Sequence, residues 1–216
     1  MPFVTSTSRL SEIIIADTSL IPVLNRFGIT LGVGDATVAD ACRAHGDIEP
    51  DFLVSILNTY LSNDYFPEQT LKGFQATTII KYLRETYAYY TRFTLANIER
   101  HFNALVGASG GDNNLGPMRK FFDTVKAAFV RLKDEDEKVT FPGLATLDAE
   151  ALAAAGAATA PVEEYLTDMA AMLIVHLRGS VDSNLCYAVI AATTALAADF
   201  SKNSRIRNRI LLNASN

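Results

Sequence analysis

The chain has no tryptophan, two cysteines and three histidines among its 216 residues, and these shortages limit its chemistry. Cys42 and Cys186 lie far apart and form no Cys-x-x-Cys pair, so no disulfide framework is predicted. We expect both to be buried apolar side chains. Because only His45, His101 and His176 could supply imidazole, ligands for a metal centre are scarce.

Positive charge is also in short supply. The chain has 19 Lys and Arg against 24 Asp and Glu, a net charge of -5, so no basic surface for nucleic acid is expected. No stretch of about eighteen apolar residues is free of charge, and the N-terminus lacks the basic-then-apolar order of a signal peptide. These absences predict a cytoplasmic protein that does not enter a membrane and does not bind nucleic acid by this chain itself.

The first 63 residues predict a small helical module, residues 1–63, with short helices separated by turns. Gly28 is expected to end one helix in the left-handed conformation. The glycine-rich loop 27–35 has no lysine and follows no strand, so phosphate binding is not favoured there. A polar, proline-stopped linker is expected at 63–67. The predicted helices open near residue 8 and then cover 19–26, 38–45 and 51–61.

Four long helices follow, each with one apolar stripe at helical spacing, and no alternating strand pattern occurs. They cover about 75–105, 117–141, 147–177 (interrupted at Pro161) and 184–212. Residues 64–216 are therefore predicted to form an up-down four-helix bundle, and the fold class is all-α. The predicted inward positions are Ile80, Leu83, Tyr87, Tyr90, Thr94, Ile98, Phe102 and Leu105, then Met118, Phe122, Val125, Phe129, Leu132, Asp136 and Val139, then Leu166, Met169, Leu173 and His176, then Leu185, Val189, Ala192, Leu196, Phe200, Asn203, Arg207 and Ile210.

Two charged residues lie on these apolar stripes. Asp136 is on the second long helix and Arg207 is on the fourth. A lone charge facing a bundle core is costly, so each needs a partner. We predict a salt bridge between them, with Tyr87 and Asn203 hydrogen-bonded around it.

The segment RFGITLGVGDATVADAC, residues 26–42, resembles the small N-terminal domain of the iron–sulfur cluster repair di-iron proteins. That domain carries an aromatic-Gly-Ile stretch followed by paired cysteines and then a helix ending in Ala-Cys. Phe27-Gly28-Ile29 and Ala41-Cys42 match this pattern. Gly32-Val33 stand where the paired cysteines belong, so the redox-active feature of the family is absent.

Residues 75–212 resemble the hemerythrin-like bundle of the same proteins, and more closely the diverged bundles that some regulators fuse to DNA-binding domains. The resemblance implies a hemerythrin-like four-helix fold and a link to stress responses. The matching segments are TIIKYLRETYAYYTRFTLANI, KFFDTVKAAFVRLKDEDEKVTFPGL, VEEYLTDMAAMLIVHL and ADFSKNSRIRNRILL.

The resemblance also implies where metal ligands would stand, and this chain departs from it at nearly all of them. The family's helix histidines and carboxylates fall on positions that here hold other residues, and only one of the six can ligate iron. No metal, cofactor or catalytic residue is therefore predicted. The six former metal-site positions are Tyr87, Leu132, Asp136, Thr159, Asn203 and Arg207.

The expected function is that of a metal-free hemerythrin-like protein, not an enzyme, serving as a sensory, regulatory or protein-interaction module. We expect a homodimer, with a protein partner or a fused regulatory domain such as a C-terminal DNA-binding domain. Two alternatives stay open. One is a cluster-repair di-iron protein with a displaced metal site, and the other is a small-ligand binder that uses the vacated bundle cavity.

Overall fold

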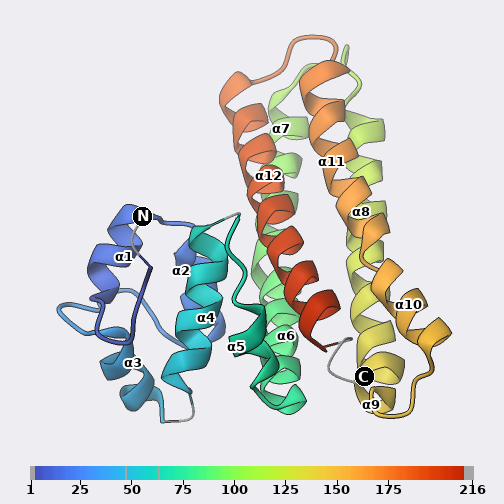
Figure 1. The fold of residues 1–216 in the computed structure, drawn as a ribbon. Coiled ribbons are helices and arrows are strands. Elements are labelled where there is room, and N and C mark those ends of the chain that lie inside the picture. Colours follow the sequence, from blue (N-terminus) through green and yellow to red (C-terminus); the bar gives the residue numbers. More distant parts are fainter. Residues whose placement is uncertain (1–2, 47, 63, 212–216) are drawn as a thin grey trace. The chain divides into compact units, whose positions relative to one another are not determined.

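The computed structural model describes residues 3–46, 48–62 and 64–211, and every regular element in this part of the chain is a helix. This confirms the predicted all-α class. Short helices come first, and four long helical stretches that pack together follow them (Figure 1). The β-type pairing among the described residues is limited to two isolated bridges, Arg9–Thr37 and Asn113–Gly179.

The chain divides into two compact units. The first contains residues 3–86 together with 209–211, and the second, which we call the bundle unit, is Tyr87–Asn208. The predicted ranges were 1–63 and 64–216, so the start of the first long helix groups with the short helices. Packing explains this grouping, because the ring of Tyr82 stacks on Phe27 at 5.5 Å and meets Phe52 edge-on at 6.0 Å.

The first unit follows the predicted short helices closely. Thr37 caps α3 in a capping box, accepting from the Asp40 N–H at 3.1 Å while the Asp40 carboxylate accepts from the Thr37 N–H at 2.9 Å. Gly28 ends α2 with φ +75°, as predicted. A further helix, α5, lies just beyond the predicted linker. The helices are α1 Leu10–Ala16, α2 Leu20–Arg26, α3 Val38–His45, α4 Pro50–Leu61, α5 Glu68–Lys72 and α6 Ala76–Tyr89, whose end enters the bundle unit.

In the bundle unit, helices that follow one another along the chain lie side by side. Helix α7 packs on α8 and α12, and α11 packs on α8 and α12, which closes a ring of four (Figure 1). Three of the long stretches contain a five-residue π segment. The elements are η1 Tyr90–Thr94, α7 Leu95–Ala108, α8 Leu115–Glu135, η2 Asp136–Thr140, α9 Phe141–Gly143, α10 Ala149–Ala157, α11 Ala160–Val175, α12 Ser183–Ile206 and η3 Arg207–Leu211.

Most of the predicted inward positions are buried. The exceptions are Ile80, Thr94, Leu185 and Ala192, which are only partly buried, and Val139 and His176, which are exposed. Val139 is 46% exposed while its neighbour Thr140 is 1% exposed, and Thr94 is only partly buried while Leu95 is 4% exposed. Thr94 and Val139 lie within the π segments η1 and η2, whose wider turn holds more residues than an α turn and so shifts the buried position by one. His176 was predicted to point inward, but it is exposed because α11 ends at Val175. Ile210 was also predicted to point inward, but its side chain lies outside the part of the chain that the structure describes.

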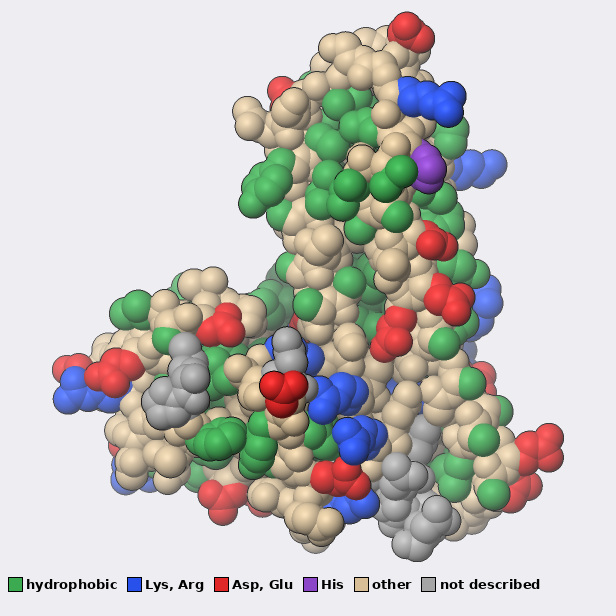
Figure 2. Space-filling model, turned by 45° about the horizontal axis from the view of Figure 1, so that its top comes forward, with side chains coloured by type: hydrophobic (Ala, Val, Ile, Leu, Met, Phe, Trp, Pro, Cys, Tyr) green, Lys and Arg blue, Asp and Glu red, His purple; other side chains and the backbone are tan. Residues whose placement is uncertain are grey.

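The bundle unit shows charges of both signs on its surface. On the face in Figure 2, acidic and basic side chains are interspersed over it. One network joins α7 to α8, where the Glu99 carboxylate accepts from Lys126 at 2.6 Å and pairs also with Arg119. These cations, Lys126 first, hold the pKa of Glu99 below its usual value. Because the network is partly exposed, it contributes little to stability.

By length and composition, one helix among the described residues could cross a membrane. It is Ser183–Arg209, with a mean hydropathy of 1.2. The sequence analysis required about eighteen apolar residues without a charge, and this helix does not meet that requirement because Asp199 interrupts its apolar run. In the structure 28% of this hydropathy window is buried, and α12 packs against α7 and α11. One such helix is weak evidence for a membrane span.

Candidate functional site

Two charged side chains meet inside the bundle unit. Asp136 begins η2 and Arg207 begins η3, and their side chains are 0% and 1% exposed. The guanidinium binds the carboxylate in bidentate fashion: Nε donates to Oδ2 at 2.7 Å and Nη2 donates to Oδ1. The predicted salt bridge is therefore present. The Tyr87 hydroxyl donates to the same carboxylate, on Oδ2, as predicted for that residue. We call these three residues the buried cluster.

Burial and charge fix the protonation of this cluster. Burial, and then the negative charge of Asp136, raise the pKa of Tyr87 well above its usual value, so the phenol stays protonated and donates. Burial by itself lowers the pKa of Arg207, but the hydrogen bonds and charge of Asp136 outweigh it and raise that pKa. The phenol and the guanidinium therefore both keep the protons that they donate to Asp136, and the bidentate geometry offsets part of the cost of burying the ion pair.

The other former metal-site positions are Leu132, Thr159 and Asn203. They are also buried, and their bonds and contacts are different from those of the cluster. Asn203 was predicted to hydrogen-bond around the ion pair, and its amide group makes bonds to η1 and within α12. Its amide donates to the Tyr90 hydroxyl at 2.8 Å and to the Asp199 carbonyl oxygen at 2.8 Å. The Thr159 hydroxyl accepts from Asn208 at 3.2 Å, and Leu132, 3% exposed, is an apolar wall. That these six positions once held metal stays a prediction.

Ligands for a metal ion do not gather at any place in the described part of the chain. There, no group of three or more His, Cys, Asp and Glu side chains is placed to hold one. His45 instead bonds the carbonyl oxygens of Ala41 and Gly28 at 2.9 and 3.0 Å. The two cysteines are buried, as predicted, and burial raises the pKa of both thiols, which makes them poor nucleophiles.

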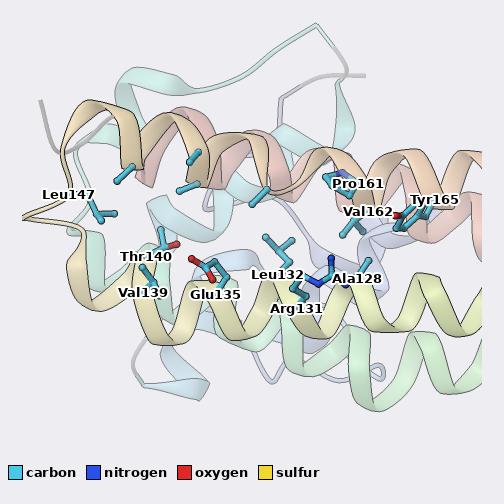
Figure 3. A pocket seen from close by; sticks show the side chains of 14 residues that line it. Ala128, Arg131, Leu132, Glu135, Val139, Thr140, Leu147, Pro161, Val162 and Tyr165 are labelled. Carbon is cyan, nitrogen blue, oxygen red and sulfur yellow. The ribbon is translucent and has the colours of Figure 1, made fainter.

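A cavity of about 440 Å³ lies next to the buried cluster. Its walls come from α8 and η2 on one side and from α10 and the start of α11 on the other (Figure 3). Leu132 and Val162 are apolar parts of the lining, and five alanines leave the space open. The polar groups of the lining are the hydroxyls of Thr140 and Tyr165 and the exposed Arg131 and Glu135. A space of this size and character suits a small, mainly apolar molecule.

Helix α10 belongs both to this cavity and to the bonding of the cluster. Ala155 lines the cavity, and its carbonyl oxygen accepts from Arg207 Nη1 at 2.8 Å. Asn208 adds a second bond, donating to the Gly156 carbonyl oxygen at 3.0 Å. A molecule in the cavity would therefore contact α10, the helix whose carbonyl oxygens accept hydrogen bonds from Arg207 and Asn208. Sequence reasoning missed Asn208 and the cavity, although the alanine-rich run 147–160 signals a helix with little side-chain volume.

Comparison of the chain with models of known protein families, with curated proteins and with solved structures finds no match.

Proposed function

We propose that the bundle unit is a metal-free, up-down hemerythrin-like sensory module without catalytic activity. The observation that carries this proposal is the bidentate Arg207–Asp136 pair with Tyr87, which fills the bundle where the resemblance expects metal ligands. A guanidinium bound to the one carboxylate of the six positions competes directly with a cation for it. No observation favours the alternative of a displaced di-iron site.

The sensory part of the proposal rests on the cavity beside the cluster. We infer that a small apolar molecule binds there and is felt by α10, because Ala155 contacts both the cavity and Arg207. Binding would alter the hydrogen bonds at Ala155 and Gly156, and so the position of α10 against α12. Ligands change an equilibrium only through contacts that differ between its states, and these bonds are such contacts.

The test measures binding of a neutral fluorescent probe, aminoanthracene, to the full chain. We expect a saturable rise in fluorescence and a change in hydrogen exchange confined to the amides of Ala149–Ala157. Ala151→Leu fills the cavity from α10 and should abolish the signal. Ala153→Leu is the matched control, since Ala153 is exposed on the same helix and does not line the cavity. Equal probe binding by the two variants would refute the proposed site.

The remaining expectations are proposals as well. We propose a cytoplasmic homodimer that signals through a protein partner or a fused regulatory domain and does not bind nucleic acid or membrane by this chain itself. Static light scattering across a concentration series tests the dimer. A mass equal to one chain at the highest concentration would refute it.

A further inference from the structure

Two side chains of opposite charge, Arg131 and Glu135, lie on the lining of the cavity beside the buried cluster. They are one helical turn apart on α8, so both project from the same face of that helix. Figure 3 shows both of them extending from α8 toward the wall that α10 and α11 form. Both are exposed, and neither is ion-paired or hydrogen-bonded within the described part of the chain. A guanidinium and a carboxylate are therefore available to a ligand in this cavity.

The apolar part of the same lining is also accessible. Val139 is 46% exposed, Leu147 and Ala151 are partly buried, and Ala154 is exposed. These side chains carry no polar atoms, so they favour a ligand whose body is apolar. Such a ligand also needs a polar head that satisfies both Arg131 and Glu135.

The opposite signs of the two charged side chains select against a charged head. A ligand carboxylate is attracted by the guanidinium and repelled by Glu135, and a ligand ammonium group meets the reverse. Either head also loses hydration as it enters the cavity, without a net attraction to offset that cost. A carboxamide is neutral, and it can accept from the guanidinium through its oxygen while its N–H donates to the carboxylate. Hydrogen bonds with one charged partner are stronger than those between neutral groups.

We propose that the cavity of the bundle unit binds an uncharged amide with an apolar chain, of the primary fatty amide class. The amide oxygen would face Arg131, the amide nitrogen would face Glu135, and the chain would lie along Val139, Leu147 and the alanines of α10. This inference rests on the proposed function, because it names the ligand class of the same cavity.

The experiment titrates heptanamide, heptanoate and heptylamine into the full chain by calorimetry at about pH 7. The three probes have the same chain length, and only the amide is uncharged at this pH. We expect heptanamide to bind at one site, severalfold more tightly than either charged analogue. Ala151→Leu should abolish this binding and Ala153→Leu should retain it. Heptanoate or heptylamine binding as tightly as heptanamide, or no binding of heptanamide at millimolar concentration, would overturn the ligand class.

Failure of this inference can be told apart from failure of the proposed function. If aminoanthracene binds and changes the exchange of the amides of Ala149–Ala157, but heptanamide has no preference over its analogues, the ligand class is wrong and the sensory site stands. If heptanamide binds as expected but leaves that exchange unchanged, the ligand class stands and the sensory function is wrong. Absence of binding by both aminoanthracene and heptanamide would refute both proposals.

Removing one charge at a time should change the order of the three ligands. Glu135→Gln leaves the guanidinium alone, so heptanoate should gain about threefold in affinity relative to heptanamide. Arg131→Met leaves the carboxylate alone, so heptylamine should gain by a similar factor. Both positions are exposed, so neither change should disturb the fold.

Matched controls for these two variants are Glu164→Gln and Lys120→Met. Both residues are exposed charges of the bundle unit that do not line the cavity, so the wild-type order of ligands should persist. An unchanged order in both Glu135→Gln and Arg131→Met, or the same change in the controls, would refute the assignment.

Discussion

Arg207 uses three guanidinium nitrogens inside the bundle unit. Nε and Nη2 bind the Asp136 carboxylate, and Nη1 donates to the Ala155 carbonyl oxygen and to the Asn208 side chain at 2.8 and 2.7 Å. Removing Arg207 would therefore leave both the buried Asp136 carboxylate and the Ala155 carbonyl oxygen without these hydrogen bonds, which is costly in free energy.

Arg207→Met and Asp136→Leu, alone and together, measure the coupling in this pair. Removing Arg207 alone leaves a buried carboxylate unpaired and should cost about 3–5 kcal/mol of the free energy of unfolding. The double variant should cost much less than the sum of the single variants, because no charge is then left buried. Urea melts of the four proteins give the coupling energy.

A surface pair provides the control for this cycle. Arg209 lies two residues further along and pairs with Glu68 at 3.0 Å, with half of its side chain exposed. Arg209→Met should change the free energy of unfolding by no more than about 1 kcal/mol. Small and additive effects of the two core substitutions would show that the buried pair contributes no coupling.

Tyr87 should make the bundle unit sensitive to alkali. Its phenol pKa is raised in the folded protein above the ordinary value of 10.0, first by burial and then by the charge of Asp136. The unfolded chain therefore loses this proton at lower pH than the folded one, so the stabilisation is complete below pH 10.0 and is lost as the pH rises above it. Tyr87→Phe should flatten the fall in stability above that pH, measured by urea melts at a series of pH values.

The exposed Tyr187 supplies the comparison for the alkaline series, since 72% of it is accessible to water. Tyr187→Phe should keep the wild-type dependence on pH. If Tyr87→Phe kept it as well, the phenol of Tyr87 would not be linked to unfolding in this range.

At the scale of whole helices, the sequence was informative wherever apolar residues repeat at regular spacing. Asp136 and Arg207 were found because they interrupt such stripes, and a buried charge on a stripe requires an opposite charge from another helix. Both are buried as the spacing predicts. The helix breaks at Pro161 and at Gly28 also carry strong local signals.

The π segments are what helical spacing could not predict. A π turn differs from an α turn by one residue, and no propensity of the residues 90–94 or 136–140 favours it over the ordinary helix. Tertiary contacts decide it, since η2 and η3 begin at the two members of the ion pair, Asp136 and Arg207. The mismatch is local: Thr94 and Val139 lie inside the segments, whereas the predicted positions after η1, which are Ile98, Phe102 and Leu105, are buried.

This phase shift can be tested at the start of α7. A regular α-helix places Thr94 inward, whereas the structure buries Leu95 and leaves Thr94 only partly covered. Leu95→Ala should therefore cost about 2–5 kcal/mol of the free energy of unfolding, while Thr94→Ala should cost less than about 1 kcal/mol. Thermal or urea melts of the two variants measure these losses of stability. A larger loss for Thr94→Ala than for Leu95→Ala would show that the helix is a regular α-helix there.

For the molecule as a whole, the bonding of the cluster explains how residues far apart in the chain define one site. Tyr87, Asp136 and Arg207 come from three of the four long helical stretches, and α10 joins through Ala155. The site is complete only when the bundle unit has closed. Sequence spacing gave the individual members, but it could not give α10, whose attachment runs through backbone carbonyl oxygens that carry no sequence signal.

Because a guanidinium holds the one candidate carboxylate, the whole chain should be stable without metal. Protein purified from iron-rich medium should contain far less than one iron per chain, and dialysis against a chelator should leave its melting temperature unchanged, since no metal binding is coupled to folding. Elemental analysis and thermal melts measure both. Roughly two irons per chain with oxo-bridge absorption would contradict the metal-free proposal.

A variant with restored ligands tests whether these positions correspond to a metal site. Tyr87→His, Leu132→His, Asn203→His and Arg207→Glu, with Asp136 kept, would put three imidazoles and two carboxylates at positions that are at most 4% exposed. If the bundle unit is hemerythrin-like, this variant should bind iron and melt at a higher temperature with the metal than without it. The matched control changes the same four positions to Phe, Met, Leu and Met, which adds no ligand. A folded ligand variant that takes up no more iron than this control would show that the side chains do not converge on a metal, and the resemblance at the former metal-site positions would then be wrong.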